Sequence, residues 1–150
     1  MLIYNIHPGI GIGPVRLGWS PAEVRTAMGS APHRFMKTAT SEHPTDAWDA
    51  FHVYYRGSPP TVDFIELGKS TEFRVRYNGI DIFGTQASDL IALLSAETPY
   101  DPHDRELGYT YVFRAIGLSL WRPFMPESET DPDGQFFEAV SLGVAGYFSG

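Results

Sequence analysis

The chain has 150 residues, of which 43% are hydrophobic and 14% aromatic, and its formal net charge is −7. This length and composition exclude a disordered or fibrous chain and predict a single domain, residues 1–150, with a core of its own. The acidic charge argues against nucleic acid as a partner, the lack of cysteine excludes disulfides and thiol chemistry, and no apolar run approaches the about 20 residues of a membrane span.

The first residues, MLIYNIHP, have neither the basic start nor the long apolar stretch of an export signal, so we expect a cytoplasmic protein. Residues 2–6 predict a short strand. The glycine-rich residues 8–14 follow, but Pro14 or Arg16 stands where the dinucleotide pattern G-x-G-x-x-G requires its third glycine. We therefore expect these glycines to allow unusual backbone angles or close packing beside the first helix.

The strongest local signal is a helix start at residues 20–23, Ser-Pro-Ala-Glu. Ser20 is typical of an N-cap, Pro21 of the first helical position, and Glu23 can bond back to the Ser20 amide in a capping box. Gly29 predicts the left-handed end of this helix. The helix has one apolar face, so we expect it to pack on a sheet.

Residues 31–50 are irregular and polar and predict a flexible surface loop that is anchored by Trp48. Two histidines and two aspartates in this segment could ligate a metal, but their spacing matches no recurrent ligand pattern, so no metal site is expected. These four residues are His33, His43, Asp46 and Asp49.

Three strands are expected next, at residues 51–55, 62–67 and 72–77, and their short connections favour an antiparallel meander. In the third strand Arg74 and Arg76 alternate with apolar residues, which is typical of a half-buried strand with one solvated face.

The second half starts after the turn dipeptide at residues 78–79 with a strand at residues 80–83. A helix capped by Thr85 follows, and it is more apolar than the first, so we expect it to be the more deeply buried. Further strands are predicted at residues 109–113, 118–121 and 136–142.

Two segments of the first half return in the second. GWSPAEVRTAM at residues 18–28 is echoed by GTQASDLIALL at residues 84–94, and VDFIELG at residues 62–68 by FEAVSLG at residues 137–143. These echoes predict an α+β fold in which a tandem pair of helix-plus-antiparallel-sheet units forms one sheet, covered by short helices on one face. The predicted halves are residues 1–78 and 79–150.

A long acidic loop spans residues 122–135 and contains Glu127, Glu129, Asp131 and Asp133. Its alternating acids resemble the start of a calcium loop, but Pro132 interrupts them and Val140 stands where the bidentate glutamate is required, so no calcium is expected. Long loops in compact domains are often functional.

The best candidate for a general base is His103, which lies between Asp101 and Asp104. No nucleophile motif accompanies it, and D-P-x-D sequences are common at turns. The sequence therefore assigns no catalytic residue and no cofactor, and it favours a non-enzymatic protein.

The segment VRLGWSPAEV at residues 15–24, closing on Met28 and Gly29, resembles the I-x-L-G-M-T/S-x-x-E-V opening of units in beta-lactamase inhibitor proteins and outer-membrane lipoprotein assembly factors. The inhibitor proteins carry two such helix-plus-sheet units in tandem, and the resemblance implies the same architecture here. Those families are exported and the inhibitors use disulfides, whereas this chain has no cysteine. In its size and acidity the chain is also similar to bacterial immunity proteins of secreted toxins.

These observations favour a binding module, an immunity-type inhibitor whose sheet face and acidic loops occlude a basic partner protein. The candidate contacts are aromatic and acidic residues that a core does not need. They are Trp48, Asp49, Tyr54, Trp121, Glu127, Glu129, Asp131 and Asp133.

Two other functions stay open. The chain could be a small-ligand carrier or minor enzyme with a pocket between sheet and helices, lined by His103, Tyr109, Tyr111 and Phe113. It could also form a homo-oligomer through unpaired sheet edges.

Overall fold

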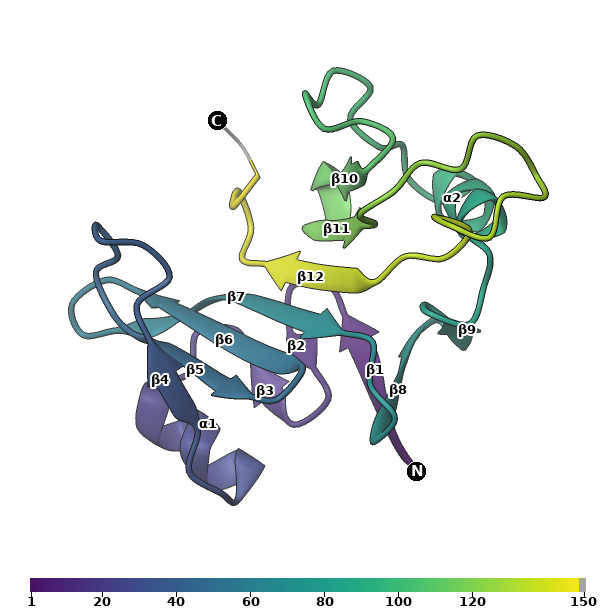
Figure 1. The fold of residues 1–150 in the computed structure, drawn as a ribbon. Helices are drawn as coiled ribbons and strands as arrows, with labels where there is room; N and C mark the ends of the chain where they lie inside the picture. Colours follow the sequence, from purple (N-terminus) through teal and green to yellow (C-terminus); the bar gives the residue numbers. More distant parts are fainter. Residues whose placement is uncertain (149–150) are drawn as a thin grey trace.

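The structure is a computed structural model that describes residues 1–148, and this part of the chain contains two β-sheets and two α-helices (Figure 1). The predicted α+β fold is confirmed, whereas the prediction of one sheet is wrong. The tandem arrangement of two equivalent halves stays a prediction. Neither α-helix of the described residues is long and apolar enough to cross a bilayer.

The smaller sheet has the strand order β3 (Val15–Arg16), β2 (Gly11–Ile12), β1 (Leu2–His7), β8 (Phe73–Tyr77) and β9 (Ile80–Asp81). Its central strands β1 and β8 run parallel, with Leu2 opposite Phe73. Among the glycines of residues 8–14, Gly11 packs so closely on the Val15 carbonyl that a Cβ atom would clash there. The expected unusual backbone angles are confirmed at Gly9 and Gly13, whose φ values are 76° and 54°.

The larger sheet has the order β10 (Thr110–Phe113), β11 (Leu118–Trp121), β12 (Ala139–Gly143), β7 (Thr61–Gly68), β6 (Phe51–Arg56), β5 (Thr45–Trp48) and β4 (His33–Phe35). Every neighbouring pair in it is antiparallel. The short 3₁₀ helix Arg114–Ile116 connects β10 to β11.

The predicted meander of three strands is wrong at its third member. Strands β6 and β7 pair as expected, but β8 joins β1 in the other sheet. The reason is that β12 occupies the free edge of β7, with Val140 opposite Leu67. On β8 itself Phe73, Val75 and Tyr77 are buried and Arg74 is exposed, as the alternation predicts.

Both sheets and both helices contribute to one hydrophobic core, in which Val75 of the smaller sheet, Ile65 of the larger sheet and Leu90 of the second helix are all fully buried. Side chains along a strand alternate between its two faces. On β6 and β7 the core therefore takes Phe51, Val53 and Leu67, while the residues between them face outward.

The first helix, α1 (Pro21–Met28), begins and ends as the sequence predicts. The Glu23 amide donates to Ser20 Oγ at 3.2 Å, and the Ser20 amide donates to Glu23 Oε1 at 3.1 Å, which completes the capping box. Gly29 ends the helix with a φ of 77°. Val24 is the residue that α1 buries in the core.

The second helix, α2 (Ala87–Ser95), buries Ala87, Leu90 and Leu94 and is the more deeply buried of the two, as predicted. Its predicted cap is wrong. The Thr85 hydroxyl donates to the Asp81 carbonyl at 2.6 Å, so it is committed to the turn before the helix, and Gln86 is the N-cap residue.

The predicted flexible loop at residues 31–50 is also wrong, because it contains the paired strands β4 and β5. Asp46 on β5 is fully buried. Its carboxylate accepts hydrogen bonds from Arg25 Nε at 3.0 Å and from the Tyr55 hydroxyl at 2.7 Å. These partners offset the cost of burying the charge and connect α1 to the larger sheet.

Candidate functional site

The outer face of the larger sheet, on the side away from the core, has small side chains at its centre. Strand alternation and register place Gly68, Ser119, Ala139, Ser141 and Gly143 there, on β7, β11 and β12. The Ser119 and Ser141 hydroxyls bond to each other. We call these five residues the small-residue floor. Glu66 lies on the same face opposite Ser141, and Tyr147 packs on Gly143 at the edge of the floor.

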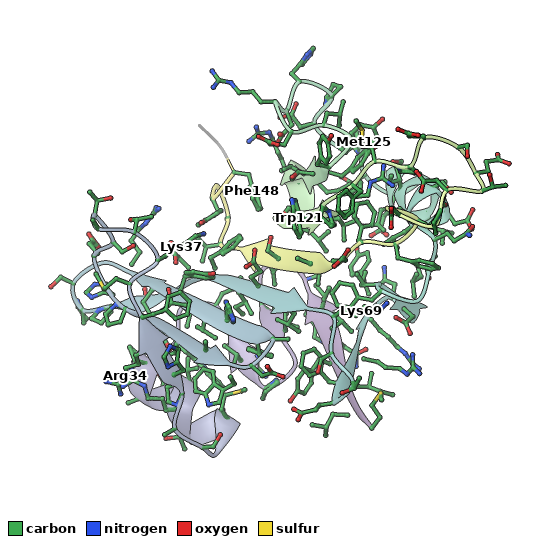
Figure 2. All side chains as sticks on the ribbon, in the orientation of Figure 1. Arg34, Lys37, Lys69, Trp121, Met125 and Phe148 are labelled. Carbon is green, nitrogen blue, oxygen red and sulfur yellow. The ribbon has the colours of Figure 1, made fainter. Side chains whose placement is uncertain are left out.

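Aromatic residues stand at two corners of this floor. Trp121, at the end of β11, is 44% exposed. Tyr54 on β6 lies beside Phe64 on β7, with ring centroids 5.5 Å apart. Figure 2 shows Trp121, Phe148 and Lys37 on the same side of β7 and β12, above the outer face.

The corner around Tyr54 is completed by the end of the described chain. The Val144 amide donates to the Asp63 carbonyl at 2.9 Å, which turns the following residues back over the sheet. The Tyr147 ring then stacks on Phe64 with centroids 4.5 Å apart, and Phe148 meets Phe64 edge-on. We call Tyr54, Phe64, Tyr147 and Phe148 the aromatic corner.

A cation of the chain itself lies on the aromatic corner. Lys37 belongs to the connection between β4 and β5, and its Nζ atom lies 4.7 Å from the centroid of the Tyr54 ring. The same atom is 6.0 Å from the centroid of Phe64. An ammonium at these distances is attracted by the electron-rich ring faces.

Two carboxylates lie next to the aromatic corner. Asp63, opposite Arg56 at 3.3 Å, has a side chain that is 13% exposed, and this burial raises its pKa although the Arg56 charge acts against it. Burial, followed by the charge of Glu66, raises the pKa of Tyr54. The Tyr54 hydroxyl therefore stays protonated, and its ring stays neutral, over the physiological pH range.

A cavity of about 280 Å³, which we call the Lys37 cavity, lies between the β4–β5 connection and the aromatic corner. Aromatic faces and carboxylates around an ammonium are the groups that recognise cations. The residues that line it and matter here are Lys37, Glu42, Tyr54, Arg56, Asp63 and Tyr147.

Two of the eight predicted contact residues, Tyr54 and Trp121, share the outer face. Trp48 faces the other way, because it pairs with the inward-facing Phe51, and its Nε1 donates to the Ser30 carbonyl at 3.0 Å. Asp49 is exposed at the turn between β5 and β6.

The acidic loop, residues 122–135, lies beside α2 (Figure 1), where the Ala87 amide donates to the Gln135 carbonyl at 2.7 Å. Its side chains Glu127, Glu129 and Asp133 are exposed. Asp131 shapes the loop instead, because its carboxylate accepts the Glu127 and Asp133 amides at 2.9 Å, and these bonds lower its pKa.

Sequence reasoning missed Lys37, Asp63 and Glu66. Asp63 comes to the outer face because the register between β6 and β7 shifts next to Tyr54 and Tyr55, which leaves it as the extra residue of a β-bulge. A bulge of this kind depends on the partner strand and leaves no mark in the local sequence.

Among the predicted catalytic and ligand-binding residues, Tyr111 packs edge-on against Tyr100 and Phe137. The Asp101 carboxylate accepts the His103 amide at 2.9 Å and Arg114 Nη2 at 2.8 Å, and both bonds lower its pKa. Phe113 is fully buried in the core, whereas Tyr109 is 38% exposed. Among residues 1–148, no three acidic or histidine side chains are grouped as metal ligands.

No protein-family model matches this chain, and comparisons with curated proteins and with solved structures also give no match. The resemblances to beta-lactamase inhibitor proteins, assembly lipoproteins and immunity proteins therefore stay predictions, and the function has to be argued from the geometry of the outer face.

Proposed function

We propose that the protein is a non-enzymatic binding module, of the immunity-type inhibitor kind, that receives a basic side chain of a partner protein at the aromatic corner. The observation that carries this proposal is the position of Lys37, 4.7 Å from the Tyr54 ring centroid. The chain's own ammonium acts there as an internal stand-in for the lysine or arginine of a partner.

Charge supports a basic partner. The whole chain carries −7, and Asp63 and Glu66 lie next to the aromatic corner. A partner cation at this corner would favour the charged form of Asp63, which burial disfavours. Complementary charge also speeds the encounter of the two proteins and selects the right partner.

The shape of the outer face supports a partner segment that extends beyond one side chain. Tyr54 and Trp121 are separated by three strand spacings across the sheet and four residues along it, which places their backbones about 20 Å apart. The small-residue floor lies between them. Tyrosine and tryptophan are enriched among the residues that contribute most of the binding energy at protein interfaces.

We further propose that the floor is the junction of two equivalent halves. The strand order β5-β6-β7 of the first half corresponds to β10-β11-β12 of the second, and β7 and β12 meet at the centre. Phe51 pairs with Leu67 as Leu118 pairs with Leu142. This correspondence supports the tandem arrangement that the sequence echoes predict.

The test uses octalysine as the probe, titrated into the isotope-labelled protein and followed by the amide signals of β6 and β7. We expect saturable, salt-sensitive binding. In the Lys37→Met background, where no internal cation competes for the ring, Tyr54→Leu should weaken it about fivefold, the loss of one cation–π contact of intermediate strength. Tyr109→Leu in the same background is the matched control, since Tyr109 is an exposed tyrosine directly before β10. Equal binding by the two variants would overturn the proposal.

A further inference from the structure

We propose that a second cavity, next to β8, binds a small aromatic carboxylate. This cavity has a volume of about 430 Å³, and we call it the β8 cavity. The residues that line it and carry the argument are Lys69, Phe73, Arg74, Asp81, Phe83 and Phe136.

The apolar walls of the β8 cavity suit a flat ring. Phe73 and Phe83 are each 7% exposed and form its buried side, whereas Phe136 is 38% exposed at its mouth. Small-molecule sites measure about 300–1,000 Å³ and are lined mainly by apolar and aromatic side chains. A volume near the lower limit fits one or two fused rings.

The charges around the cavity favour an anion. Lys69 and Arg74 line the cavity together with one carboxylate, Asp81, which accepts a hydrogen bond from Arg74 Nη1 at 3.1 Å. The Gly84 amide occupies the other oxygen of Asp81 at 2.9 Å. Two cations against one carboxylate leave a positive excess in a chain of net charge −7.

Lys69 and Arg74 can both reach a ligand. Lys69 Nζ lies 6.0 Å from the centroid of the Phe136 ring, so its ammonium is at the mouth beside the apolar wall. The Arg74 side chain is 54% exposed, and a guanidinium has five N–H donors, of which Asp81 takes one. A carboxylate between the two cations would receive charge-assisted hydrogen bonds while its ring contacts Phe83 and Phe136.

The β8 cavity is separate from the aromatic corner and opposite to it in charge preference. Lys69 directly follows the last residue of β7, whereas Lys37 lies over Phe64 within that strand. Figure 2 shows the two lysines well apart. One site therefore selects anions and the other cations, and the two proposals do not depend on each other.

The experiment compares three probes of the same ring system, 2-naphthoate, 2-naphthalenemethanol and 2-naphthylmethylammonium, by amide shifts of β8 and the Phe136 side-chain signals. We expect 2-naphthoate to bind saturably in the millimolar range, and the neutral alcohol about tenfold more weakly because it lacks the charge-assisted bonds. The ammonium probe should be weaker still.

The variant Lys69→Met should weaken 2-naphthoate about fivefold to tenfold while leaving the alcohol unchanged. Lys37→Met removes an equal charge at the other cavity and should leave both probes unchanged. Lys69 is exposed, so the fold should tolerate its replacement, which circular dichroism checks. Equal affinity for the carboxylate and the alcohol, no saturation by any probe, or an unaltered Lys69→Met variant would each overturn the proposal.

Discussion

Replacing Lys37 with methionine should strengthen the binding of octalysine, because it removes the chain's own cation from the aromatic corner. A cation–π contact at an exposed site contributes about 0.5–1 kcal/mol. A contact of that strength between Lys37 and Tyr54 keeps the corner occupied about 70–85% of the time, so removing it raises the apparent affinity about threefold to sixfold.

The control for this experiment is Lys69→Met, which makes the net charge more negative by the same single unit. General attraction between an acidic protein and a basic peptide is therefore equal in the two variants. We expect Lys69→Met to change the affinity less than about twofold at physiological salt, where distant charges are screened. Amide-shift titration gives both dissociation constants. Equal gains in the two variants would show that bulk charge, and not displacement of Lys37, sets the affinity, and would refute the reasoning.

Three further predictions concern stability and the loop. Asp46→Ala should lower the free energy of unfolding, measured in urea, by about 3 kcal/mol. The reason is that it leaves Arg25 without its buried partner and the Tyr55 hydroxyl without an acceptor. A loss under about 1 kcal/mol would contradict this. Because burial raises the pKa of Asp63, the folded protein holds the carboxyl proton more tightly than the unfolded chain does. The free energy of unfolding, compared with that of Asp63→Asn, should therefore fall as the pH rises from the ordinary aspartate range through the raised pKa. Parallel pH profiles of the free energy of unfolding for the two proteins would contradict this. Asp131→Asn should speed proteolysis of the loop at residues 122–135, because it weakens the hydrogen bonds from two loop amides. The control Glu129→Gln changes an exposed side chain and should leave the cleavage rate unchanged. Equal cleavage rates for the two variants would show that Asp131 does not hold the loop in shape.

The features that could be predicted from the sequence are the local ones. The capping box of α1 involves Ser20 and Glu23, three residues apart, and the helix end needs only Gly29, so the signal and its effect lie within one short segment. The failed cap at Thr85 shows the limit of this reasoning, because the hydroxyl found a closer acceptor in the preceding turn, the Asp81 carbonyl.

Long-range pairing could not be predicted in the same way. Whether β8 joins β7 or β1 depends on which strand takes the free edge of β7, and β12 takes it from a distant part of the chain. Aspartate is a residue type that favours loops, so the sequence around Asp46 does not predict its burial. Its burial depends on contacts with Arg25, Arg34 and Tyr55. Two residues of the candidate site, the exposed Trp121 and the half-buried Tyr54, were predicted from the sequence. Lys37 could not be predicted, because its contact with Tyr54 depends on how the β4–β5 connection folds over the sheet.

The proposed tandem arrangement relates the two predicted aromatic residues, Tyr54 and Trp121, and leads to the last prediction. The pair Phe51 and Leu67 of the first half corresponds to the pair Leu118 and Leu142 of the second half. In this alignment Tyr54 and Trp121 occupy equivalent positions of the two halves. Their backbones lie about 20 Å apart, which an extended octalysine of about 26 Å can span and a trilysine of about 10 Å cannot.

Trp121→Leu should therefore weaken octalysine binding about fivefold, the loss of one aromatic contact, and leave trilysine binding at the Tyr54 corner unchanged. In the Lys37→Met background, where no internal cation competes, Tyr54→Leu should weaken both peptides, because each uses that corner. If Trp121→Leu weakened the short and the long peptide equally, the two corners would not act as separate ends of one binding surface. If it weakened neither, the partner segment would be confined to the half of the sheet that carries Lys37.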